Sequence, residues 1–136
     1  MSTPYARGEN FSIAVDGGHA LAAVWRRPDL DSAAGARSAN ELTFHLRKLT
    51  PQLKSLVLDL RDAPVVAGPK TVETLGELLR GCEKASVRVA VVLSGDPMQL
   101  LQFRRLVATY APTEGKAVVS LTDAEAHVRP KLRPQR

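Results

Sequence analysis

The fold of this chain is decided by residues 55–80, which read Ser55-Leu-Val-Leu-Asp-Leu-Arg-Asp-Ala-Pro-Val-Val-Ala-Gly-Pro-Lys-Thr-Val-Glu-Thr-Leu-Gly-Glu-Leu-Leu-Arg80. Residues 56–60 are almost continuously apolar, which is typical of a strand buried on both faces of a sheet. After an irregular stretch, apolar residues recur from Val72 to Cys82 at the spacing of one helix face. Gly68 and Pro69 suit the N-cap and the first position of that helix. We therefore expect a strand, a loop and a helix, with the loop at the sheet edge where α/β proteins often place their sites.

The elements before this unit can be predicted from the same kinds of pattern. Apolar residues alternate with small or polar ones from Phe11 to Trp25, and Asp16-Gly17-Gly18 is a strong turn signal, so a hairpin is predicted. A helix is predicted over 38–49, where Ser38 and Glu41 have the spacing of a capping box.

The elements after it complete the predicted fold. Residues 87–93 form a second apolar run, and Asp96 followed by proline predicts the start of another helix. A short strand is expected over 116–121, and Thr122 is expected to open a final helix. This order predicts an α/β domain with a mixed sheet, made of an N-terminal hairpin plus mostly parallel strands, and about four helices.

Length and charge indicate one domain with a distinct tail. The chain has 136 residues, which is enough for one sizeable core. We expect a disordered lead over 1–9, the domain over 10–128 and a basic flexible tail over 129–136. The tail holds four of the 19 Lys and Arg residues and no acid, so the other 15 nearly balance the 14 acidic residues. A solubilising tail is favoured over nucleic-acid contact through it.

Composition also bears on the compartment. No apolar run approaches the length of a membrane span, and the first residues lack the apolar stretch of a signal peptide. Cys82 is the single cysteine and cannot form an internal disulfide. Its place on an apolar helix face predicts a buried small hydrophobe. Together these features predict a cytoplasmic protein.

No catalytic constellation stands out, so we expect a protein that is not an enzyme. His19, His45 and His127 have no neighbour at metal-ligand spacing, so no metal and no cofactor are expected. Residues 67–71 lack the first glycine of a phosphate-binding loop, and a proline there removes one N–H. Asp59 is expected to be structural and to position the loop that follows it.

At this point a family pattern can be recognised. The stretch from Leu56 to Leu79 resembles the core of STAS domains, the family of anti-sigma factor antagonists in bacterial signalling. Asp59-Leu60 and the flanking apolar positions match at residue level, and the order of elements over about 10–128 is also similar. The family's Asp-Ser-Ser-Gly falls on Ala67-Gly-Pro-Lys70, so no phosphorylatable serine stands there. The nearby hydroxyls of Thr71 and Thr74 do not match the motif position. The resemblance therefore implies a binding module whose phosphorylation switch is absent or moved.

The function that follows is protein–protein interaction in a regulatory complex, with a kinase- or anti-sigma-like partner. The docking surface is expected to comprise loop 62–71 and the exposed face of the next helix, with these partner-binding candidates: Val65, Val66, Gly68, Pro69, Lys70, Thr71, Glu73, Thr74 and Glu77. The alternative is a small apolar-ligand or lipid-binding module, or the soluble STAS subunit of a transporter complex. An empty, sizeable apolar cavity would favour the ligand-binding alternative. Dimerisation through the first hairpin stays open.

Overall fold

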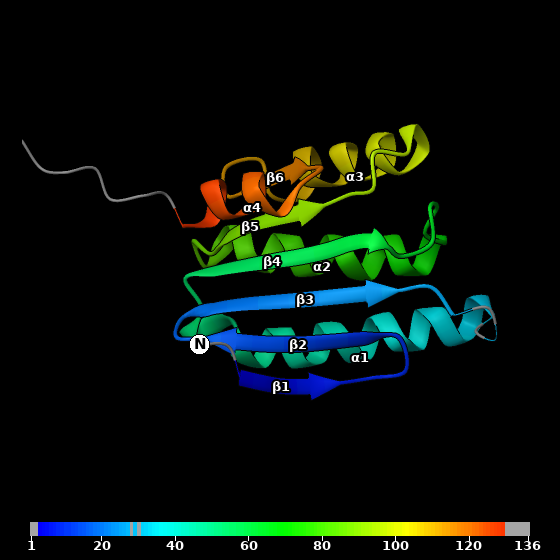
Figure 1. Cartoon of the computed structure of the whole chain (residues 1–136), viewed down its shortest axis with the longest axis horizontal. Helices are drawn as coiled ribbons and strands as arrows, with labels where there is room; N and C mark the ends of the chain where they lie inside the picture. The colour runs from blue at the N-terminus through cyan, green and yellow to red at the C-terminus, as the bar shows by residue number, and fades with distance from the viewer. Residues whose placement is uncertain (1–2, 28, 30, 130–136) are drawn as a thin grey trace, which may run out of the picture.

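The computed structural model describes residues 3–27, 29 and 31–129 (Figure 1). In chain order its elements are β1 (Thr3–Arg7), β2 (Phe11–Asp16), β3 (His19–Trp25), α1 (Ser32–Leu49), a 3-10 turn (Thr50–Gln52), β4 (Ser55–Asp62), α2 (Pro69–Lys84), β5 (Arg88–Val92), α3 (Pro97–Tyr110), β6 (Gly115–Val118) and α4 (Leu121–Val128). The six strands form one sheet in the order β1-β2-β3-β4-β5-β6. The pairs β1–β2 and β2–β3 are antiparallel, whereas β3 to β6 run parallel. The predicted mixed α/β fold with four helices is confirmed.

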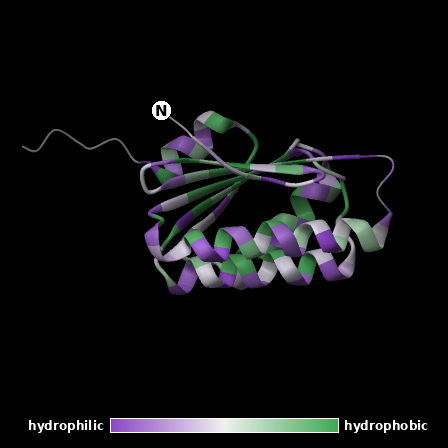
Figure 2. Cartoon of the chain, turned by 90° about the horizontal axis from the view of Figure 1, so that it is seen from below, coloured by the Kyte–Doolittle hydropathy of each residue, from purple (hydrophilic) through white to green (hydrophobic). Residues whose placement is uncertain are grey.

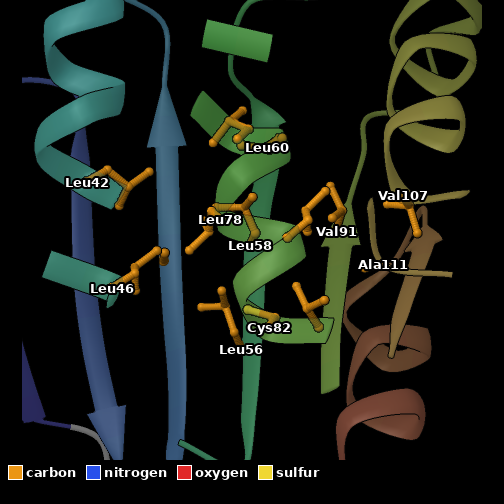
Figure 3. Close-up of a cluster of buried hydrophobic side chains, with 14 of the residues drawn as sticks. Leu42, Leu46, Leu56, Leu58, Leu60, Leu78, Cys82, Val91, Val107 and Ala111 are labelled. Atoms are coloured by element: carbon orange, nitrogen blue, oxygen red, sulfur yellow. The ribbon is translucent and has the colours of Figure 1, made fainter. Parts of the chain in front are cut away.

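The helices cover the two faces of the sheet unequally. Figure 2 shows long helices in a layer below the sheet and a short helix on the opposite side. Side chains alternate between faces along a strand, so Leu56, Leu58 and Leu60 of β4 join the main core under α1, α2 and α3. Val57 points the other way, into a small second core with α4. Figure 3 shows Leu42 and Leu46 of α1 pointing toward the side of the sheet where these β4 leucines and Leu78 of α2 lie. β4 is therefore buried on both faces, as its apolar run predicted.

The expectation of a disordered lead over 1–9 is wrong for the described part. Thr3–Arg7 forms β1, which pairs with β2 and is interrupted by a register shift between Pro4 and Ala6. The Arg7 guanidinium lies 5.4 Å from the centre of the Trp25 ring, and the Tyr5 ring meets His45 edge-on. The segment alone has no strand pattern, but the free edge of β2 supplies its hydrogen-bond partners.

The start of α1 also differs from the prediction. α1 begins at Ser32, and the Asp31 carboxylate caps it by accepting a hydrogen bond from the Ala34 N–H at 2.8 Å. Ser38, the expected N-cap, lies inside the helix, is buried, and donates its hydroxyl to the Asn10 side chain. The helix extends toward the N-terminus beyond Ser38 because Ala33 and Ala34 have a high helix propensity.

Smaller differences occur at the C-terminal end. Ser120, not Thr122, caps α4, by accepting a hydrogen bond from the Asp123 N–H at 3.1 Å. The last strand, β6, ends at Val118 rather than at 121. Most of the expected basic tail, residues 130–136, lies outside the described residues. Within the described part, none of the helices has the length and apolar character needed to cross a membrane.

Candidate functional site

The connection between β4 and α2 lies at the carboxyl edge of the parallel strands. β4 ends at Asp62 and α2 begins at Pro69, so residues 63–68 join them. Gly68 is the N-cap of α2 with extended backbone and Pro69 opens the helix, as the sequence predicted. The connection from β5 to α3 reaches the same edge, because β4 and β5 are parallel neighbours. Two chain connections and two helix N-termini therefore meet there.

Two glutamines of α3 hold this edge together. Gln102 accepts a hydrogen bond from the Ala67 N–H (3.0 Å) and donates one to the Ala67 carbonyl (3.1 Å). Gln99 is fully buried. Its Oε1 accepts from the N–H of Ser94 (2.8 Å) and from the Ser94 hydroxyl (3.0 Å), while its Nε2 donates to the Leu60 carbonyl (2.9 Å). Since both side chains bond to backbone groups, the loop is held in one place against α3.

We call the two hydrogen bonds between Gln102 and Ala67 the Gln102 clamp. Three large apolar side chains are exposed on the two segments that it joins. Val66 is 56% exposed, Met98 58% and Leu101 49%. Met98, Leu101 and Gln102 are spaced i, i+3 and i+4, so they share one face of α3. Gln102 bonds to Ala67, the residue after Val66. Val66, Met98 and Leu101 are therefore exposed on the loop and the helix that these hydrogen bonds join, and we name these three side chains the carboxyl-edge patch.

A pocket of about 370 Å³ opens beside the patch, between α1, the loop and the start of α2. Its floor is made by fully buried apolar side chains of the main core, among them Phe11, Leu42, Leu60 and Phe103. Val66 stands at its rim. Gly35 of α1 lines another part of the wall, where a Cβ would meet no atom within 4 Å. A pocket of this size favours the ligand-binding alternative, whereas the exposed carboxyl-edge patch favours the interaction module.

The polar groups on the pocket wall bond to the protein itself. Ser38 donates to the side-chain amide oxygen of Asn10, and Asp31 caps α1. The Arg27 guanidinium forms an ion pair with Asp29 and donates to the Glu9 carbonyl at 3.2 Å. Arg27 therefore has Asp29 as its counter-ion, and the Asp31 carboxylate bonds the N-terminus of α1.

The structure divides the predicted partner-binding residues between two surfaces. Val66, Gly68 and Thr71 line the pocket described above, which we call the carboxyl-edge pocket. Pro69 and Lys70 are exposed and stand between Gly68 and Thr71 in the sequence. Val65 is only half-exposed in the same loop.

The other three candidates lie along α2, facing α1 instead. Glu73, Thr74 and Glu77 line a groove of about 320 Å³ together with α1 residues. The Thr74 hydroxyl donates to the Asn40 side chain at 3.0 Å. Arg80 approaches Glu77 at 3.9 Å. A partner seated on the loop would therefore meet the first group, and the second group belongs to a separate groove.

Asp59 does not position the loop. It lies inside β4, and its carboxylate accepts hydrogen bonds from Arg61, from the N–H at 3.1 Å, from Nε at 3.0 Å and from Nη2 at 2.8 Å. Burial acts to raise the pKa of Asp59, and the bonds from Arg61 outweigh it, so the pKa is below its ordinary value. These bonds join Asp59 to Arg61 of its own strand, whereas the side chain of Gln102 bonds the loop backbone at Ala67.

The groups with catalytic potential are inert or engaged. Burial raises the pKa of the Cys82 thiol to about 12, so the reactive thiolate is suppressed. His19 Nδ1 lies 2.5 Å from the hydroxyl of Ser55, which is itself buried. His127 bonds the Glu114 carbonyl at 2.8 Å. No group of three or more metal-ligating side chains occurs among residues 3–27, 29 and 31–129.

Sequence reasoning missed Met98, Leu101, Gln102 and the pocket. One signal was present for the first two: Leu100 and Leu101 are consecutive and Met98 precedes them, so a single helix face cannot bury all three. The Gln102 contact joins residues 35 positions apart. No local pattern encodes such a contact.

Comparison with known proteins adds no relative. No protein-family model matches this chain, and no curated protein matches it. The resemblance to STAS domains therefore stays a proposal, and the activity has to be inferred from the surface itself.

Proposed function

We propose that this protein is a non-catalytic interaction module that docks a regulatory protein on the carboxyl-edge patch. The observation that carries the proposal is the joint exposure of Val66, Met98 and Leu101 around a loop that Gln102 holds in place. Apolar side chains gathered on a surface mark interaction sites more often than scattered ones do. A loop that is already ordered also loses less conformational entropy when a partner binds.

The chemistry of the surface indicates what the partner presents. Burial of each exposed apolar side chain contributes on the order of 1–2 kcal/mol, so the three anchors together support a specific complex. Lys70 lies exposed beside the pocket and adds a positive charge at the rim. We infer a partner with an apolar centre and an acidic border, of the kinase or anti-sigma class that the STAS resemblance implies. The buried, unpaired Cys82 supports a cytoplasmic setting.

The experiment is affinity capture of the tagged protein from its own cells, with the captured proteins quantified by mass spectrometry. The variants Val66→Asp, Met98→Asp and Lys70→Glu are compared with the wild type. Phe44→Asp serves as the matched control, because Phe44 is 58% exposed, as Met98 is, but lies on α1 beside the other groove.

We expect one protein to be recovered with the wild type and with Phe44→Asp. Its yield falls at least about tenfold with Val66→Asp and with Met98→Asp, because each places a carboxylate in the apolar contact. Lys70→Glu lowers the yield less and makes it less sensitive to salt. Equal recovery with all folded variants would refute the docking site, as would loss confined to Phe44→Asp.

A further inference from the structure

The carboxyl-edge pocket has a second property that docking on the patch does not use. Its volume of about 370 Å³ exceeds that of a dry cavity of about 150 Å³ that can hold benzene. Apolar side chains form its floor and the loop forms one wall. Protein pockets for small molecules combine this size with a mostly apolar lining and few polar groups.

The polar groups of the pocket indicate the charge of a ligand. Arg27 forms an ion pair with Asp29, and the Asp31 carboxylate accepts a hydrogen bond from the first turn of α1. A ligand carboxylate would have to compete with Asp29 for Arg27 and would meet the negative charge of Asp31, so the pocket disfavours an anion. The Thr71 hydroxyl makes no hydrogen bond to another residue in the described part of the chain, so it can serve one neutral polar group of a ligand.

We propose that this pocket binds an uncharged small molecule that is mostly hydrocarbon and carries one hydroxyl or carbonyl group. At about 30 Å³ per heavy atom, the volume of a liquid water, the space holds on the order of ten heavy atoms. The hydrocarbon part packs on Phe11, Leu42 and Phe103, and the polar end lies near Thr71 at the start of α2. The inference goes beyond the proposed docking function, since it concerns the pocket and not the exposed patch.

The test is isothermal titration calorimetry of the full chain with 1-octanol, an uncharged probe of suitable size, and with octanoate, its charged counterpart. We expect saturable binding of one octanol per chain with a negative heat-capacity change, the mark of apolar burial. Octanoate should bind at least about tenfold more weakly. Lack of saturable octanol binding would overturn the site, and equal or tighter octanoate binding would overturn the uncharged class.

A matched pair of glycine substitutions localises the binding. Gly35→Leu places a side chain where the wall has open space, and Gly81→Leu does the same on α2, where a Cβ also meets no atom within 4 Å. Gly81 does not line this pocket. Both changes replace a helical glycine with a better helix former, so neither should unfold the protein.

Gly35→Leu should weaken octanol binding at least about tenfold, and Gly81→Leu should leave it unchanged. Ala39→Leu, also in the pocket wall, gives a second filling variant, with circular dichroism confirming the fold of each. Octanol should also raise the melting temperature of the wild type and of Gly81→Leu, but not that of Gly35→Leu. Unchanged binding in both folded filling variants would place the ligand elsewhere and refute the proposal. Met98 does not line the pocket, so loss of partner capture with Met98→Asp would leave octanol binding unchanged, and the two proposals fail separately.

Discussion

At the scale of single residues, two glutamines one turn apart on α3 differ in burial and in the backbone groups that they bond. Gln99 is fully buried and satisfies both the Ser94 N–H and the Leu60 carbonyl. Gln102 is half-buried and bonds the backbone of Ala67. The cost of losing a hydrogen bond is set by whether water can replace the missing partner. Gln99 therefore matters for stability, and Gln102 matters for the shape of the docking loop.

The corresponding prediction compares Gln99→Leu with Gln102→Leu. Gln99→Leu removes every hydrogen bond of a fully buried side chain, although the Leu60 carbonyl still accepts from the Ala63 N–H, and should lower the free energy of unfolding by roughly 1–3 kcal/mol. Gln102→Leu should cost about 1 kcal/mol or less, because water reaches Ala67. Urea unfolding followed by circular dichroism measures both. Equal losses in the two variants would contradict this account of the edge.

At the scale of elements, the approach of α2 to α3 depends on one glycine. A Cβ at Gly76 would lie 2.7 Å from Cε2 of the Tyr110 ring, which is closer than non-bonded carbons can approach. Arg80 covers the same ring, with its guanidinium 5.0 Å from the ring centre. Gly81, five residues later on the same helix, faces open space. α2 contains these two glycines, and only their surroundings distinguish them.

We therefore predict opposite effects for two identical substitutions on α2. Gly76→Ala gains helix propensity but displaces the Tyr110 ring, and it should lower the free energy of unfolding by about 1–2 kcal/mol. Gly81→Ala has only the propensity gain and should raise that free energy by about 0.5–1 kcal/mol. Thermal unfolding of both variants, with the wild type beside them, measures the difference. A stabilised Gly76→Ala would show that α2 and α3 are not packed this closely.

At the scale of the whole molecule, several groups couple stability to pH in the same direction. Burial, followed by the charges of Arg129 and Lys54, lowers the pKa of His19 below its ordinary 6.5. The pKa of Glu83 is lowered by hydrogen bonds from the N–H groups of Glu114 and Thr113. Asp59 is shifted the same way by Arg61. In each case the unfolded chain binds protons more readily than the folded one, so acid favours unfolding.

The sign of each shift predicts the order in which stability is lost. Between pH 8 and 6.5 the free energy of unfolding should stay nearly constant. It should begin to fall below pH 6.5, where an unfolded His19 gains a proton that the folded state disfavours, and fall again below about pH 4 as the carboxylates protonate. Urea titrations at several pH values measure this profile. His19→Gln should remove the loss between pH 6.5 and 5 and leave the more acidic one.

Much of this architecture follows from local sequence. Residues 56–60 are apolar except for Asp59, so this segment had to be covered on both faces, and the sheet follows from satisfying its backbone groups. Gly68-Pro69 and Asp96-Pro97 marked two helix starts correctly, because an N-cap acts through atoms within three residues. The position of the docking loop at the carboxyl edge follows from the same strand–loop–helix order.

The rest was decided by contacts between distant residues. β1 exists because β2 offers an unpaired edge, and Ser38 became an interior residue because Asn10, 28 positions away, accepts its hydroxyl. The division of the predicted partner-binding residues depends on how α1 packs on α2. The spacing between separate elements decides the pocket, the exposure of Met98 and the Gln102 clamp. A local sequence pattern contains information only on hydrophobicity and secondary-structure propensity. The sequence by itself therefore determined the elements and their order, and the tertiary structure alone decided which surfaces they leave open.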